Sequence, residues 1–134
     1  MNKMIWAFRR VIKEKYATFD GRASRSEYWW FALGSFLISL VIKFVFGIFD
    51  MGETAISIYS IFIFIPSIAV SVRRLHDIGK SGWYYLVFAV SLFLMAWFSF
   101  LMMLLAFLLF LYWVCKASEQ GPNRFGEQPE ETLS

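Results

Sequence analysis

The chain alternates short charged segments with long apolar stretches. One apolar stretch covers residues 28–49 and a second covers residues 54–74, with the acidic turn Asp50–Glu53 between them. About 20 helical residues rise roughly 30 Å, which matches the hydrocarbon core of a bilayer. We therefore predict two transmembrane helices that form an antiparallel hairpin.

A third apolar run covers residues 83–115. As one helix it would extend about 50 Å, well beyond a ~30 Å hydrocarbon core. Aromatic residues occur at its start, near Trp97 and near its end, and such residues favour the membrane interfaces. We therefore predict two short helices, residues 83–97 and 100–115, with a turn near Trp97 to Ser99. The alternative is one long third helix.

The segment before the first apolar stretch has a helical pattern of its own. Between Met4 and Tyr16 the apolar residues recur at spacings of three and four, and basic residues occupy the other positions. This pattern predicts a basic amphipathic helix within residues 1–23. Such a helix either lies on an anionic leaflet or packs on its own transmembrane bundle, and the sequence leaves both readings open.

Two local signals refine the hairpin. Ser24 and Glu27 have the spacing of a capping box and mark the start of the first membrane helix. Pro66 falls inside the second helix, where it removes a backbone donor and predicts a kink. A polar tail, residues 116–134, follows the last apolar run.

Composition supports a single membrane domain over residues 1–134. Hydrophobic residues make up 59% of the chain and charged residues only 17%, so the apolar surface has to face something other than water. We predict an all-α membrane protein, a small bundle of four (alternatively three) transmembrane helices preceded by the amphipathic helix. Because Cys115 is the single cysteine, no intramolecular disulfide or thiolate zinc site is expected.

The distribution of charge predicts the orientation. Seven Lys or Arg residues precede Tyr28, the turn Asp50–Glu53 has none, and Arg73, Arg74 and Lys80 follow the second stretch. By the positive-inside rule, the N-terminus and the loop of residues 73–82 are expected in the cytoplasm. A net charge of +3 is too small, and too closely tied to the membrane flanks, to indicate a nucleic-acid partner.

Polar residues beside the membrane form the candidate site. Their charges either set the orientation and complement helix dipoles, or together bind the phosphate of a lipid head group or another anion. The candidate residues are Arg22, Arg25, Arg73, Arg74, His76, Asp77, Lys80 and Arg124.

Catalysis is not expected. His76 beside Asp77 is the one pair suited to proton transfer, and GxSxG, HExxH and P-loop motifs are absent. We therefore expect no enzyme, no catalytic residue, no metal and no cofactor. Lys43, inside an apolar stretch, is either functional or paired with Asp50 or Glu53 near the outer interface.

Several motifs carry a resemblance to a known family. Residues 19–29, FDGRASRSEYW, residues 66–83, and residues 121–126, GPNRFG, together resemble the domain-of-unknown-function 805 family of small bacterial inner-membrane proteins. The resemblance implies a multi-spanning protein of the inner membrane and brings no catalytic residues. Residues 123–126 are by default a simple turn of the tail. The resemblance instead suggests that they fold back onto the basic loop of residues 73–82, which requires a cytoplasmic tail.

The expected function is non-catalytic binding or scaffolding. The expected partners are the lipid bilayer and anionic lipid head groups at the cytoplasmic face. The alternative is a small oligomeric transporter or channel component, suggested by Lys43, Pro66 and the serines of the second helix. Four short helices enclose little space, so a pore would need an oligomer, and nothing in the sequence indicates one.

Overall fold

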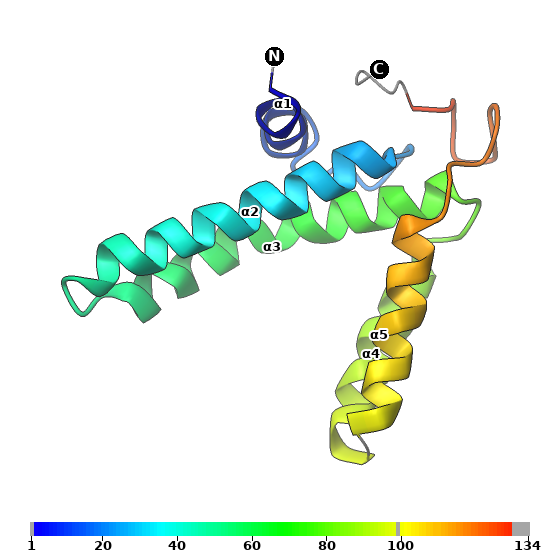
Figure 1. Cartoon of the computed structure of the whole chain (residues 1–134). Coiled ribbons are helices and arrows are strands. Elements are labelled where there is room, and N and C mark those ends of the chain that lie inside the picture. Colours follow the sequence, from blue (N-terminus) through cyan, green and yellow to red (C-terminus); the bar gives the residue numbers. More distant parts are fainter. Residues whose placement is uncertain (1, 99, 130–134) are drawn as a thin grey trace. The chain divides into compact units, whose positions relative to one another are not determined.

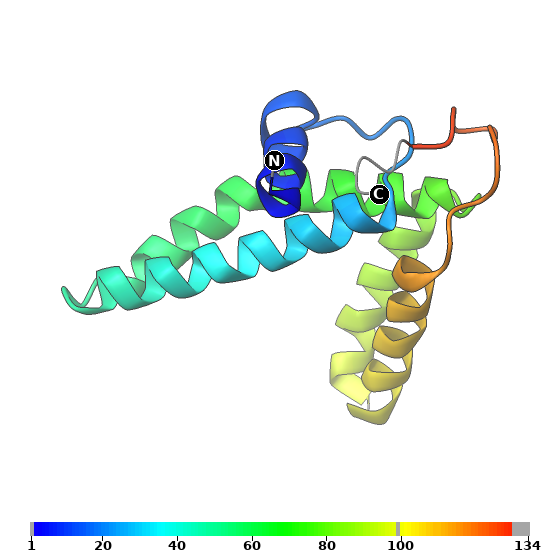
Figure 2. The same ribbon diagram turned by 45° about the horizontal axis from the view of Figure 1, so that its top comes forward.

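The chain folds into helices that form two compact units (Figures 1 and 2). The computed structural model describes residues 2–98 and 100–129, and for residues 95–98 it describes the backbone alone. Over these residues the regular elements are helical, apart from one antiparallel bridge between Asn123 and Gly126. Of the described residues, the first unit comprises 2–18 and 26–70, and the second comprises 19–25, 71–98 and 100–129.

The first unit contains the predicted antiparallel hairpin except for residue 25 and the last turns of α3, residues 71–77, which belong to the second unit. Helix α2 (Arg25–Gly47) and helix α3 (Gly52–Asp77) are both long and apolar enough to cross a membrane. The chain reverses at Asp50, which adopts a left-handed φ of 56°. Lys43 Nζ lies 3.2 Å from Glu53 Oε1 across the turn, so the predicted pairing of Lys43 is confirmed.

The hairpin exposes large apolar side chains over much of its length. Phe44 on α2 and Ile61 on α3 are both 76% exposed. Exposing so wide an apolar surface to water is energetically unfavourable, whereas lipid chains solvate it. The exposure therefore fits two helices immersed in a membrane.

The N-terminal helix packs against α2 within the same unit. Helix α1 (Lys3–Arg9) continues as the π-helix η1 (Arg10–Glu14). Ala7 and Val11 are fully buried, and the Phe8 ring lies 5.4 Å from that of Phe31. Of the two readings left open by the sequence, packing on the protein's own helices is therefore the one that the structure shows.

Pro66 lies inside α3, and the helix continues through it. Proline has no N–H, so the carbonyl of Phe62, four residues earlier, loses its usual helical donor. The hydroxyl of Tyr16 donates a 2.6 Å hydrogen bond to this carbonyl. The segment after η1 thereby satisfies the acceptor that the proline leaves open, while the predicted kink stays a prediction.

This contact gives a first testable expectation. Replacing Tyr16 with Phe should destabilise the protein by about 1–3 kcal/mol, because the Phe62 carbonyl then lacks a partner. In the Pro66→Ala background the same change should cost less, because the alanine N–H replaces the hydroxyl. Thermal unfolding of the four proteins of this double-mutant cycle in detergent would measure the coupling, and purely additive effects would contradict the account.

The second unit contains a pair of shorter helices. The structure has two helices here, α4 (Trp83–Phe98) and α5 (Phe100–Cys115), as predicted. The alternative prediction, one long helix, is not what the structure shows. They run antiparallel, since Tyr84 contacts Trp113 and Phe88 stacks on Phe110. The predicted turn ends at Ser99, which lies outside the described residues. Each helix is about 24 Å long, which is shorter than a ~30 Å hydrocarbon core. The number of membrane spans therefore stays a prediction.

Candidate functional site

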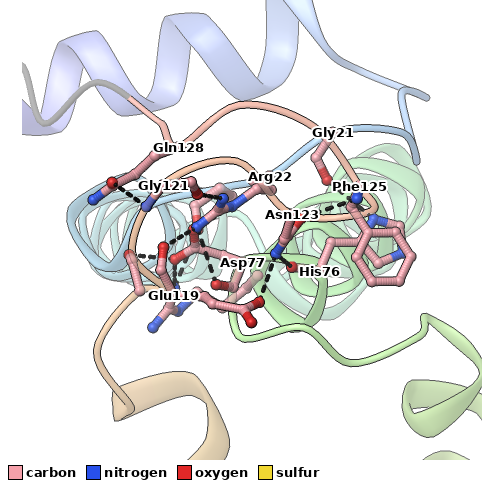
Figure 3. A network of polar contacts seen from close by, with 12 residues as sticks. Gly21, Arg22, His76, Asp77, Glu119, Gly121, Asn123, Phe125 and Gln128 are labelled. Atoms are coloured by element: carbon pink, nitrogen blue, oxygen red, sulfur yellow. Dashed lines mark hydrogen bonds and ion pairs between the residues drawn. The ribbon is translucent and has the colours of Figure 1, made fainter.

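Three segments of the second unit meet at the C-terminal end of α3 (Figure 3). They are the loop of residues 19–25, the last turns of α3, and the tail after α5. Helix α3 stops in a Schellman motif, in which Lys80 N–H donates to Leu75 and Gly79 N–H donates to His76. Gly79 has a φ of +74°, the left-handed conformation that ends a helix in this motif.

A buried carboxylate lies at the centre of this junction. Asp77 Oδ1 accepts a 2.9 Å hydrogen bond from Arg22 Nε, and Asp77 Oδ2 accepts hydrogen bonds from Arg74 and from the hydroxyl of Ser118. The side chains of Arg22, Arg74 and Asp77 are all fully buried. We call these three residues the Arg–Asp–Arg cluster.

Arg22 connects the cluster to the tail. Its Nη1 donates to the carbonyl of Gly121 at 2.6 Å, and its Nη2 donates to the carbonyl of Glu119 at 2.5 Å. The backbone N–H of Glu119 in turn donates to the carbonyl of Asp77 at 2.9 Å. One arginine thus holds the tail against the end of α3.

Arg74 connects the cluster to the end of α5. Its Nε donates to the carbonyl of Val114 at 3.0 Å, and its Nη2 donates to the carbonyl of Lys116. Carbonyls at a helix C-terminus lack helical donors and carry partial negative charge, so a guanidinium is a suitable partner. Arg74 also donates to the carbonyl of Ala23 at 3.3 Å, which attaches the loop before α2.

His76 forms the second contact between α3 and the tail. Its ring stacks on Phe125 with centroids 3.9 Å apart and an interplanar angle of 2°. Its Nδ1 lies 3.0 Å from the carbonyl of Gly21, and Asn123 Nδ2 donates to the carbonyl of His76 at 2.9 Å. The predicted folding back of residues 123–126 onto the basic loop is therefore confirmed.

The environment of His76 favours a neutral ring. His76 lies beyond the predicted spanning segment of residues 54–74, and burial lowers its pKa below the usual value near 6.5, while the hydrogen bond with Gly21 and the charge of Asp20 partly oppose this. A neutral imidazole whose Nδ1 carries the proton donates to the Gly21 carbonyl. Its stacking on Phe125 makes the ring a packing element between α3 and the tail.

The structure brings some of the predicted site residues together and leaves others outside. Arg22, Arg74 and Asp77 form the buried cluster, with His76 beside them, and Arg73 is also fully buried. The remaining three candidates lie at the surface. They are Arg25 and Arg124, which are exposed, and Lys80, which is half-buried.

Surface aromatic rings accompany two of these cations. Lys80 Nζ lies 4.7 Å from the ring centroid of Tyr84 and 5.0 Å from that of Trp113. The Arg124 guanidinium lies 4.6 Å from the ring centroid of Phe125. Cation–π contacts of this kind orient a cation without neutralising its charge, so both side chains still present positive charge at the surface.

Tail residues supply contacts that the sequence did not single out. Ser118 and Glu119 lie in a segment that has no helical pattern. Their charge and polarity alone did not predict which residues they would contact. Their role in holding the tail comes from contacts with Asp77 and Arg22, which lie more than 40 residues earlier in the chain. Among residues 2–98 and 100–129, no group of three or more His, Cys, Asp or Glu side chains could hold a metal ion.

Comparisons with known proteins place these residues in a family context. The model of a family described as a protein of unknown function, DUF805, matches residues 16–127. Inner membrane protein YhaH of Escherichia coli strain K12 is 35% identical over 136 residues, covering 95% of this chain and 98% of its own length. Inner membrane protein YhaI of the same strain is 30% identical over 120 residues, covering 89% and 92%. No solved structure matches the chain.

Proposed function

This chain belongs to the DUF805 family of proteins of unknown function, and from that premise we propose that it is a non-catalytic binding or scaffolding protein of the inner membrane. Its cytoplasmic face contacts anionic lipid head groups. The motifs that suggested the family lie within the matched residues 16–127, so the predicted resemblance is confirmed.

One observation carries the proposal: the buried Arg–Asp–Arg cluster holds the loop, α3 and the tail together as one folded surface. The donors of Arg22 and Arg74 are directed at Asp77 and at backbone carbonyls, so these arginines build the surface rather than bind a ligand. Among the candidate site residues, the cations left for an anion are Arg25, Lys80 and Arg124. Head-group phosphates attract such membrane-flanking cations.

The arrangement of polar groups also supports a non-catalytic protein. Asp77 is fully buried and engaged by Arg22, Arg74 and Ser118, and the His76 ring is stacked on Phe125. A general base has to reach a proton on its substrate. In the one His–Asp pair singled out by the sequence, His76 instead packs on Phe125 and Asp77 is held by two arginines.

The tail contacts support an even number of membrane spans between residue 22 and the tail. Arg22, before α2, contacts the carbonyls of Glu119 and Gly121, after α5. Both segments therefore lie on the same side of a membrane, which needs an even number of crossings between them. Two or four crossings meet this condition and three do not. We propose four, in which α2 and α3 supply two and the α4–α5 hairpin supplies the other two.

A reporter experiment tests whether the number of crossings is even. Reporters that are active only in the cytoplasm or only outside it, fused after Ser134, should show a cytoplasmic tail, because positive charge retains the segments that contact the tail in the cytoplasm. A matched pair of fusions within the turn Asp50–Glu53 should report the outside. An external tail would contradict both the four-span topology and the tail contacts.

A lipid-binding experiment tests the proposed function. The purified protein in non-ionic detergent is titrated with phosphatidylglycerol or with phosphatidylcholine, and native mass spectrometry counts the lipids retained. The triple variant Arg25→Gln, Lys80→Gln, Arg124→Gln should lose about tenfold or more of its affinity for phosphatidylglycerol. An unchanged affinity would refute the proposal, and the Lys43→Gln variant controls for loss of charge elsewhere.

The rival function, a small oligomeric transporter or channel component, has lost part of its support. Lys43 pairs with Glu53 at the exposed end of the hairpin, and Ser57 donates its hydroxyl to the carbonyl of Glu53 in its own helix. Both side chains therefore have structural partners. Light scattering of the purified protein would test this alternative, because a stable oligomer would support a transporter or channel function.

A further inference from the structure

An apolar groove lies in the first unit, between the N-terminal helix and α2. It has a volume of about 440 Å³, within the range of ~300–1,000 Å³ that is typical of small-molecule sites. Gly34 lets the helices approach closely, since a Cβ there would lie 3.2 Å from both Met4 and Phe8. The groove is lined by Met4, Ile5, Phe8, Arg9, Ile12, Lys13, Gly34, Leu37 and Ile38.

The apolar lining remains open to its surroundings. Ile5 is 59% exposed and Leu37 is 41% exposed, although both belong to helices that pack together. Leu37 and Ile38 lie well inside α2, a candidate membrane span, and in a bilayer this part of a spanning helix is surrounded by lipid chains. An acyl chain can therefore reach the groove from the bilayer without crossing water.

Two cations mark the same groove. Arg9 and Lys13 both line it, and both are exposed. They are four residues apart in the continuous α1–η1 segment, which places them on neighbouring turns of one face. Their aliphatic stems cover apolar surface while their charged ends remain free to meet an anion.

We propose that this groove binds one anionic phospholipid, with an acyl chain against Ile5, Leu37 and Ile38 and the phosphate on Arg9 and Lys13. An apolar groove bordered by cations is complementary to an amphiphile that has an apolar chain and a negative head. The site rests on the proposed function for its class of ligand, but it uses none of the residues assigned to that function.

The test starts from the triple variant Arg25→Gln, Lys80→Gln, Arg124→Gln, so that the other lipid-contacting cations are already removed. Native mass spectrometry then measures binding of 1-palmitoyl-2-oleoyl phosphatidylglycerol and of the matching phosphatidylcholine. The triple variant should still retain one phosphatidylglycerol. Adding Arg9→Gln and Lys13→Gln should weaken it on the order of tenfold and leave phosphatidylcholine unchanged.

A second variant tests the groove itself. Ile38→Trp places a large ring in the groove and should remove the retained lipid whatever its head group. If this variant does not fold, the exposed Arg9→Gln and Lys13→Gln changes still decide the question. The inference is overturned if they leave phosphatidylglycerol binding unchanged, or if the groove proves to be covered by a second copy, seen as a lipid-free dimer that Ile38→Trp dissociates.

The two proposals fail in different ways. If the triple variant binds phosphatidylglycerol as tightly as the unmodified protein, and the Arg9→Gln and Lys13→Gln changes then abolish binding, the surface of Arg25, Lys80 and Arg124 is refuted and the groove stands. If the triple variant alone abolishes all lipid binding, the groove is refuted and the surface stands.

Discussion

Replacing Asp77 with Asn should destabilise the second unit by about 3–5 kcal/mol, the usual cost of breaking a buried ion pair by removing one partner. Asn has nearly the same shape as Asp but no charge, so Arg22 and Arg74 would remain buried without a counterion. Since both arginines also hold the tail, the tail should detach. Trypsin, which cleaves after Lys116 and Arg124, should then release it more than a hundredfold faster, because cleavage follows the population of the open form.

The matched control is Asp50→Asn. Asp50 is exposed, lies in the outer turn and belongs to the other unit. An exposed substitution away from a buried network usually changes stability by less than about 0.5 kcal/mol, so the rate of tail cleavage should not change. If Asp77→Asn gave the same cleavage rate as this control, the cluster would not be what holds the tail.

Replacing Arg74 with Lys should also be strongly destabilising, by about 3 kcal/mol. The guanidinium contacts Asp77 and the carbonyls of Val114, Lys116 and Ala23, and a single ammonium group cannot present donors in all of these directions. Because charge is retained, orientation by the positive-inside rule should be unaffected. Thermal unfolding in detergent would measure the loss, and the reporter fusions would verify that the topology is unchanged.

Arg25→Lys provides the comparison for Arg74→Lys. The same chemical change is made at an exposed position of the same unit, where it should cost less than about 0.5 kcal/mol. Equal unfolding temperatures for the two variants would mean that the contacts of Arg74 add no stability. A large loss at Arg74 alone would assign the effect to the geometry of its donors.

Before the tertiary structure is considered, the sequence already determines the helices and the kind of solvent they need. Apolar stretches of spanning length predict α2 and α3, because a hydrocarbon core excludes charge and requires each backbone group to bond within its own helix. The short turn between them allows Lys43 to pair with Glu53. These features depend on residues that are close together in the chain, so they can be recognised from the sequence.

Only the tertiary structure decided the use of the polar residues. The sequence predicted that Arg22, Arg74 and Asp77 belong to one candidate site. It could not distinguish arginines that are available to bind an anion from arginines whose donors already bond to carbonyls. That distinction depends on Gly121, Glu119 and Val114, which the chain brings close across 40 to 99 residues. Similarly, Tyr16 meets the carbonyl left open by Pro66 only after the N-terminal segment has packed against the hairpin. Burial and donor direction are properties of the folded chain, and they determine whether a charge holds the fold together or remains available to a ligand.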